Sequence, residues 1–290
     1  MVKCYTVRMK IGAHVSAAGG IFNAPLNAAN IGCETFQVFS RSPQGGPASK
    51  LTDEVVAQFK ANMKVKGFDR FVIHTPYYIN FASTTPRIRY GSISIVRDEL
   101  ERGTLLGASY VVTHLGSTKD AGKKLGFHKT WRSLQRILDG YKGTTKLLLE
   151  LSAGAGDLTG GSFKELADLL KNAESAAKYR GKMGICLDTC HAFAAGYDIR
   201  TKKGIDAMME EIAGTVGTKR VMLIHANDSE FGLNKRRDRH AHIGKGEIGV
   251  EAFRILLHSP MFKNVDMIVE TPPDGAQDDV RLLKRLRDEE

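Results

Sequence analysis

Short apolar runs bounded by turn residues recur along the chain, and most of them end in a polar or ionisable residue. Eight such runs occupy residues 10–14, 35–39, 71–74, 111–114, 147–150, 185–188, 221–225 and 267–270. Their hydrophobicity is continuous rather than alternating, which is typical of parallel strands covered on both faces. The pattern therefore predicts eight buried parallel strands.

Segments with helical spacing separate these runs. In residues 162–179, Ser162 and Glu165 form a capping box ahead of an apolar face that includes Leu166. Further helices are expected at residues 52–65, 92–107, 129–140, 204–215, 249–258 and 278–287. The last six strand ends are 36 to 45 residues apart, which indicates a repeated strand–loop–helix unit.

Eight such units in 290 residues favour an α/β fold, a single closed (β/α)8 TIM barrel, with an open doubly wound sheet as the alternative. We expect residues 9–290 to form the barrel and residues 1–8 to be an N-terminal extension, because no linker or composition shift divides the rest. In such a barrel the active site lies at the C-terminal ends of the strands.

The composition favours an anionic partner. The 42 Lys and Arg residues exceed the 32 Asp and Glu residues, which gives a formal net charge of +10. That excess suits nucleic acid, although solubility alone also explains it. The four cysteines form no CxxC pair, and no apolar run has membrane length, so we expect a protein of a reducing compartment with no membrane partner.

Ionisable residues end six of the predicted strands. They are His74, His114, Glu150, Asp188, His225 and Glu270. One such residue is usually a hydrogen-bonded core residue, but six of them meeting at one barrel mouth would repel each other or shift their pKa values strongly. Divalent cations would satisfy all of them together.

Two local motifs extend this set. Asp188 and His191 lie three residues apart, and Asp238 and His240 lie two apart in the loop after the seventh strand. The result is nine candidate ligands, five His and four carboxylates, a mixture typical of catalytic zinc or manganese. Three divalent ions would bring +6 against −4 from the carboxylates, and the remaining charge favours an anionic phosphate.

Several stretches together resemble the endonuclease IV family of apurinic/apyrimidinic-site nucleases. They are IGAHVSAAGG at 11–20, HTPYYIN at 74–80, LDTCHAFAAGYD at 187–198, HANDS at 225–229, DRH at 238–240 and ETP at 270–272. The resemblance runs from about residue 9 to residue 273, and every ligand position of the family is filled.

The resemblance implies a zinc-dependent endonuclease of DNA base excision repair. It would hydrolyse the phosphodiester bond 5′ to an abasic site in duplex DNA and leave a 3′-hydroxyl. Three zinc ions per chain are implied, with Glu150 and Glu270 as catalytic residues. By the family's motifs, the first zinc is bound by His74, His114 and Glu150, the second by Glu150, Asp188, His225 and Glu270, and the third by His191, Asp238 and His240.

The DNA contacts follow the family less closely. Tyr77 matches the aromatic residue that enters the DNA beside the extruded nucleotide. The loop at residues 42–46 lacks the arginine and the following tryptophan that the family usually has there, so we expect Arg41 or Lys50 to compensate through phosphate contacts. Arg236, Arg237 and Arg239 are expected at the mouth, where phosphates approach.

Two other functions stay open at this stage. A metal-dependent sugar isomerase or epimerase also places His, Asp and Glu at strand ends, although it has no use for the trio His191, Asp238 and His240. A non-catalytic binder of abasic DNA is the second alternative. We expect a monomer, located in the cytoplasm with the nucleoid in a prokaryote, while a nuclear or virus-associated location stays open.

Overall fold

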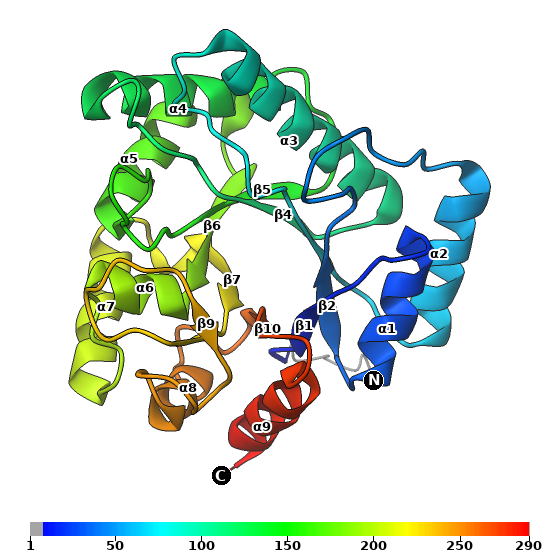
Figure 1. Cartoon of the computed structure of the whole chain (residues 1–290), viewed down its shortest axis with the longest axis vertical. Helices are drawn as coiled ribbons and strands as arrows, with labels where there is room; N and C mark the ends of the chain where they lie inside the picture. Colours follow the sequence, from blue (N-terminus) through cyan, green and yellow to red (C-terminus); the bar gives the residue numbers. More distant parts are fainter. Residues whose placement is uncertain (1–7, 290) are drawn as a thin grey trace, which may run out of the picture.

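The computed structural model describes residues 8–289, and within them eight parallel strands close a barrel (Figure 1). Around the barrel the order is β1-β10-β7-β6-β5-β4-β3-β2. The strands are β1 (Ile11–Val15), β2 (Thr35–Val38), β3 (Val72–His74), β4 (Tyr110–Thr113), β5 (Lys146–Glu150), β6 (Met183–Asp188), β7 (Val221–His225) and β10 (Asp266–Val269). The predicted α/β barrel is confirmed. Of the predicted N-terminal extension, residues 1–7 lie outside the described residues.

Helices follow the strands and surround the barrel (Figure 1). The longer ones are α2 (Asp53–Val65), α3 (Pro86–Leu106), α4 (Lys123–Leu138), α5 (Phe163–Ala173), α7 (Lys202–Gly214), α8 (Val250–Leu257) and α9 (Ala276–Asp288). α3 and α4 begin six residues before their predicted starts, since Pro86 can occupy a first helical turn and the Lys-rich start of α4 has no apolar periodicity. The predicted 162–179 helix is instead α5 followed by the 3-10 turn η2 (Ala177–Tyr179).

The sequence pattern did not predict two short helices. One is α1 (Ala24–Asn30), preceded by the 3-10 turn η1 (Ile21–Asn23). The other is α6 (Thr189–Ala195), which starts directly at the end of β6 with Asp188 as its N-cap. The 3-10 turn η3 (Thr218–Arg220) precedes β7. No described helix is both long enough and apolar enough to span a bilayer.

A layer of buried side chains lies in the barrel interior below the mouth. Six strands contribute one buried residue each, namely Val72, Val112, Leu148, Cys186, Leu223 and Ile268. Since alternate residues of a strand point to the same side, the residue two positions later on each strand also points inward. Those residues are His74, His114, Glu150, Asp188, His225 and Glu270. The period of two therefore carries every predicted strand-end ligand to the same mouth.

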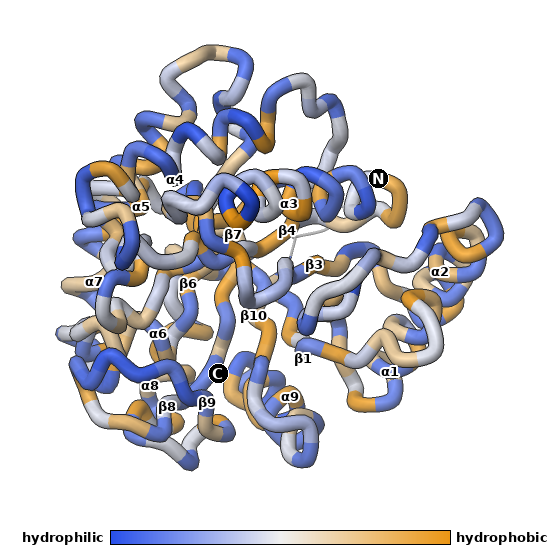
Figure 2. The backbone as a smooth tube through the Cα atoms, turned by 45° about the horizontal axis from the view of Figure 1, so that its top comes forward, coloured by the Kyte–Doolittle hydropathy of each residue, from blue (hydrophilic) through white to orange (hydrophobic). Residues whose placement is uncertain are grey.

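The remaining two strands continue this layer. An added Cβ on Gly12 would lie 1.7 Å from Thr35 O and 3.4 Å from the Ile268 side chain, so β1 and β2 approach each other closely here. Two positions further along are His14 and Gln37. The larger apolar core fills the space between the strands and the helices, and Figure 2 shows hydrophobic colour along the central strands.

A two-stranded antiparallel sheet, β8 (Asp228–Ser229) with β9 (His240–Ala241), lies in the connection after β7. The buried carboxylate of Asp228 accepts hydrogen bonds from the backbone N–H groups of Gly244, Gly246, Ile248 and Gly249 at 2.9–3.2 Å. This carboxylate therefore organises the loop that follows His240.

Candidate metal centre

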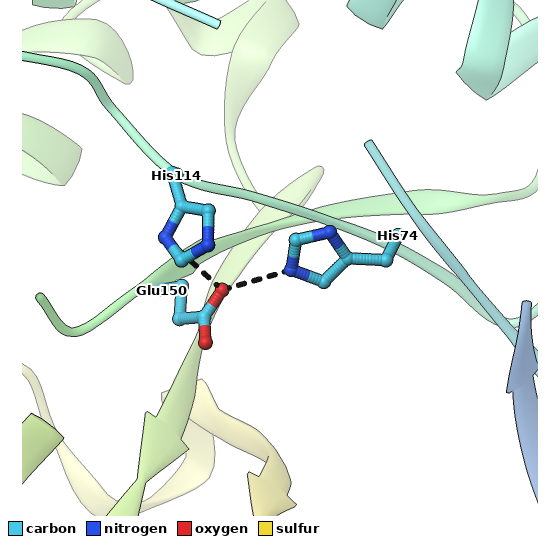
Figure 3. Close-up of side chains that lie close together, drawn as sticks. All are labelled: His74, His114 and Glu150. Carbon is cyan, nitrogen blue, oxygen red and sulfur yellow. Dashed lines mark hydrogen bonds and ion pairs between the residues drawn. The ribbon is translucent and has the colours of Figure 1, made fainter. Parts of the chain in front are cut away.

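Glu150 lies at the centre of the site. Its carboxylate is buried, with Oε2 3.0 Å from His74 Nε2 and 3.5 Å from His114 Nδ1 (Figure 3). Its Oε1 lies 2.9 Å from His225 Nδ1 and 3.6 Å from His191 Nδ1. Both oxygens of one carboxylate thus face imidazoles from different segments of the chain.

The nine predicted ligands form three groups. Within each group, ligand atoms lie within 4.8 Å of one another. The groups are His74, His114 and Glu150; Glu150, Asp188, His225 and Glu270; and His191, Asp238 and His240. The sequence resemblance predicted these same three sets. A cavity of about 350 Å³ opens onto them.

Backbone carbonyls fix the orientation of two imidazoles. His74 Nδ1 lies 2.7 Å from Thr75 O, and His191 Nδ1 lies 2.8 Å from Leu151 O. A ring nitrogen beside a carbonyl oxygen carries a proton, so in the neutral imidazole the opposite Nε2 presents a lone pair. This is the arrangement in which proteins hold a metal-binding histidine.

Two further imidazoles are held in the same way. His225 Nε2 lies 2.9 Å from the amide oxygen of Gln37, which leaves Nδ1 facing Glu150. His240 Nδ1 lies 3.2 Å from Glu270 O, which leaves Nε2 toward Asp238. In each ring the opposite nitrogen is therefore the one available to a metal ion.

Two of these nitrogens test whether the site suits a metal ion. His191 Nε2 and His240 Nε2 are buried and, within the described residues, have no hydrogen-bond partner. Oxygens of Asp238 lie 3.1 Å and 3.2 Å from them, but without the angles of a hydrogen bond. An unpartnered buried polar atom is destabilising, and a cation between the three side chains would satisfy all of them. The donor set therefore fits a divalent metal.

The acidic groups of the site depend on nearby positive charge. Burial would raise the pKa of Glu150, but the imidazoles of His114 and His225 hold it well below its usual range. Burial would likewise lower the pKa of His191, but Asp188 and Asp238 raise it well above the usual value. Protons on the imidazoles or bound cations can supply the charge that these carboxylates require.

A fourth group, Asp188, Cys190 and His240, shares two members with the others. Burial raises the pKa of the Cys190 thiol, and the sulfur donates to Arg239 O at 3.5 Å. Because the thiolate is the form that binds metal, a neutral thiol here is a poor ligand.

Three polar residues around the centre were not predicted from the sequence. Gln37 Nε2 donates to Glu270 Oε1 at 2.6 Å while its oxygen faces His225. Asn227 donates to Asp188 Oδ2 at 2.7 Å and accepts from the Glu270 backbone N–H at 2.8 Å. His14 Nδ1 lies 3.8 Å from Glu270 Oε1. A polar Gln in the apolar run 35–39 was the available signal, since buried polar groups need partners.

The predicted DNA contacts occupy different surroundings. Tyr77 is 64% exposed at the rim of the mouth, with its ring 5.3 Å from that of Phe39. Arg41, expected to reach phosphates, instead has a nearly buried guanidinium that pairs with Asp98 and Glu99 of α3. Those ion pairs hold Arg41 against the barrel wall.

The basic loop before His240 is exposed. Arg236 donates to Gly154 O at 3.1 Å, and Arg237 lies over the ring of Phe231 at 4.8 Å. Arg239 donates to the carbonyl of Asp238 at 2.9 Å. Within residues 8–289, none of these three guanidinium groups pairs with a carboxylate, so their charge stays open to an anion.

Comparison with known proteins is consistent over almost the whole chain. Residues 26–286 match the family model of the xylose isomerase-like TIM barrels. A probable endonuclease 4 from Halothermothrix orenii is 36% identical, and the match covers 96% of this chain and 99% of the relative. A second, from Chloroflexus aggregans, is 39% identical over 94% of this chain and 95% of its own length.

Solved structures give the same result. The crystal structure of endonuclease IV from Thermus thermophilus aligns with a TM-score of 0.84 and 32% identity, covering 96% of this chain and 98% of that chain. A D-tagatose 3-epimerase-like protein shares the barrel at a TM-score of 0.71, but at 18% identity it supports the fold alone. The chain therefore belongs to the endonuclease IV family, within the xylose isomerase-like TIM barrels.

Proposed function

We propose that this chain is a zinc-dependent AP endonuclease that hydrolyses the phosphodiester bond 5′ to an abasic site in duplex DNA and leaves a 3′-hydroxyl. The observation that carries the proposal is the third group, in which buried His191 Nε2 and His240 Nε2 both face Asp238 without a hydrogen bond. The family membership supports DNA as the substrate.

Three zinc ions per chain are proposed, one for each group of side chains, with Glu150 shared between the first two. Imidazole and carboxylate donors suit zinc, and the thiol of Cys190 is not required. When bound, divalent ions supply Lewis acidity that favours phosphodiester hydrolysis at neutral pH. The side chains described above hold and orient that centre.

Glu270 is the residue best situated to act on the attacking water. Its side chain lines the cavity, where it is 16% exposed, whereas Glu150 is 1% exposed and surrounded by imidazoles. We assign Glu270 the orientation of the water and the acceptance of its proton, while Glu150 links the first two groups. Tyr77 at the rim is proposed to enter the DNA beside the extruded nucleotide.

Incision of a duplex with one abasic analogue tests the proposal. The wild-type protein is expected to cut 5′ to the lesion, and Glu270→Gln to lose several orders of magnitude in rate. The exposed Glu251→Gln on α8 is the matched control and should keep the wild-type rate. Binding of abasic DNA without any incision by zinc-loaded wild-type protein would contradict the proposal and favour a non-catalytic binder.

A sugar isomerase or epimerase is the second candidate, because such enzymes also place His, Asp and Glu side chains at strand ends around one or two metal ions. The two functions differ in metal content. Elemental analysis should find three zinc ions per wild-type chain, and His191→Ala should lose one of them. One or two ions in the wild-type protein, together with turnover of a ketose, would support the sugar enzyme instead.

A further inference from the structure

The outer wall of the barrel carries a second basic surface, on the neighbouring helices α3 and α4 (Figure 1). α4 contains no Asp or Glu but has Lys123, Lys124, Lys129, Arg132 and Arg136. A hollow of about 170 Å³ lies between the two helices. The residues that we call the α3–α4 surface line this hollow: Arg89, Tyr90, His128, Lys129, Arg132 and Arg136.

Two cations from different helices meet at one aromatic ring. The guanidinium carbon of Arg89 lies 4.8 Å from the ring centre of Tyr90, and that of Arg136 lies 5.1 Å from it. Tyr90 itself is 44% exposed. The pKa of its hydroxyl is lowered by a hydrogen bond with Arg89 and by the charge of Arg136. Cations gathered in this way repel each other unless an anion joins them.

Residues 8–289 supply no carboxylate to act as this anion. Within the part of the chain that the structure describes, none of Arg89, Lys129, Arg132 and Arg136 pairs with a carboxylate. By contrast, Arg97, two turns further along α3, pairs with Glu101 at 2.8 Å. The charge of the α3–α4 surface is therefore available to an outside partner.

The arrangement indicates a regular polyanion. His128, Arg132 and Arg136 follow one another at intervals of four residues, so they form a row along one face of α4. From Lys123 to Arg136 the helix spans about 20 Å. The planar guanidinium matches phosphate oxygens in pairs, and evenly spaced phosphates fit such a row better than the irregular carboxylates of an acidic peptide.

The segment that leads into α3 connects this surface with the mouth along the chain. α3 begins at Pro86, shortly after the rim segment that holds Tyr77, and Arg89 lies in its first turn. We propose that the α3–α4 surface binds backbone phosphates of duplex DNA beyond the segment held at the mouth. The inference deepens the proposed function and rests on it only for the choice of DNA as the polyanion.

Binding of undamaged duplexes of 10 and 30 base pairs to the zinc-loaded protein tests this. Arg132→Glu with Arg136→Glu should weaken binding of the long duplex about tenfold and of the short duplex less than twofold. The slope of log K against log salt for the long duplex should fall by about 2, since two phosphate contacts are lost. Lys66→Glu with Lys219→Glu has the same charge change at exposed sites near the opposite end of the barrel and should change each affinity less than twofold.

Three results would overturn the inference. The first two are an equal loss of affinity for both duplex lengths and an equal loss of affinity in the control variant. The third is displacement of the long duplex by poly-glutamate as readily as by DNA of equal charge. The last would indicate an acidic protein partner. If the double reversal does not fold, Lys129→Gln with Arg132→Gln carries the same comparison. Incision of an abasic 10-base-pair duplex is measured separately, so failure of the proposed function is distinguishable from failure of this surface.

Discussion

The amide nitrogen of Gln37 donates a 2.6 Å hydrogen bond to Glu270 Oε1, and the same amide faces His225 through its oxygen at 2.9 Å. One side chain on β2 thereby fixes a carboxylate and an imidazole that come from two other strands. Such supporting contacts typically contribute 10- to 100-fold to metal affinity or activity.

Replacement of this amide tests that support. Gln37→Leu should lower the incision rate at saturating DNA by about 10- to 100-fold. KM should change little, because the substitution disturbs the orientation of Glu270 and leaves the contacts with DNA intact. Single-turnover kinetics measure the effect. Gln58→Leu, at an exposed position of α2, is the control. An unchanged rate in Gln37→Leu would show that Glu270 needs no such support.

Asp228 should contribute mainly to stability. Asp228→Asn removes the charge that accepts hydrogen bonds from four N–H groups of the loop after His240. The free energy of unfolding is expected to fall by about 2–3 kcal/mol. Urea unfolding measures it. Asp206→Asn, in an exposed pair with Lys202, should change the free energy of unfolding by less than about 0.5 kcal/mol. Equal losses in the two variants would contradict this role.

A pair of glycine substitutions should have opposite effects. In Gly12→Ala the new methyl would overlap Thr35 O, so β1 and β2 must separate. The free energy of unfolding should fall by about 3 kcal/mol or more. In Gly91→Ala, within α3, the methyl meets no atom within 4 Å, and the helix should gain about 0.5–1 kcal/mol. Thermal unfolding of both proteins checks the contrast. A stable Gly12→Ala would show that the barrel tolerates a wider spacing.

Glu34 should contribute to the free energy of unfolding in a pH-dependent way. Burial would raise its pKa, but hydrogen bonds from Arg287 and from the Ile11 N–H lower it. A carboxyl with a lowered pKa in the folded state stabilises the protein above its unfolded pKa, and this contribution is lost as pH falls through the folded value. Glu34→Gln should therefore be less stable than wild type by about 1 kcal/mol at pH 7, and the difference should shrink below about pH 4.

Unfolding curves from pH 3 to pH 7 measure the Glu34 contribution. Glu251→Gln, whose carboxylate is 63% exposed, should show no such trend. A difference between Glu34→Gln and wild type that stays constant over this range would contradict the linkage to Arg287.

Removal of zinc should weaken both activity and stability. A chelator is expected to abolish incision and to lower the free energy of unfolding. The decrease should be about 2.7 kcal/mol for each site whose Kd was exceeded a hundredfold by the free zinc concentration. Re-addition of zinc should restore both. Calorimetry of the chelated and reloaded protein measures this, with exposed His258→Ala as a control that keeps all metal. An unchanged melting temperature would argue against a metal centre.

The strand-end residues were predictable because of a simple geometric rule. A parallel strand is apolar throughout, so an ionisable residue such as Glu150 at its end marks both the strand end and the mouth. The alternation of side chains along a strand would also have placed Gln37 at the mouth. Gln37 lies two residues after Thr35, just as Glu150 lies two residues after Leu148. An uncharged amide is a weaker signal than an ionisable residue, because burial of a polar group costs less than burial of a charge.

Other features depend on contacts between distant segments. From its position after β2, Arg41 is expected to contact DNA phosphates. The structure instead pairs it with Glu99, a carboxylate buried within α3. The short α6 was not predicted because its N-cap, Asp188, is also the last residue of a strand. The role of Asp228 was not predicted because its partners are backbone N–H groups, which no sequence motif identifies.

The small sheet β8–β9 carries His240 outside the ring of eight strands, whereas both other groups are built from residues at or just after barrel strands. Two of the three residues of the third group, Asp238 and His240, consequently come from a single connection, and residues 228–249 could be exchanged for a plain connection without breaking any hydrogen bond between barrel strands. A barrel that keeps only the first two groups of side chains is thus one loop replacement away from this architecture.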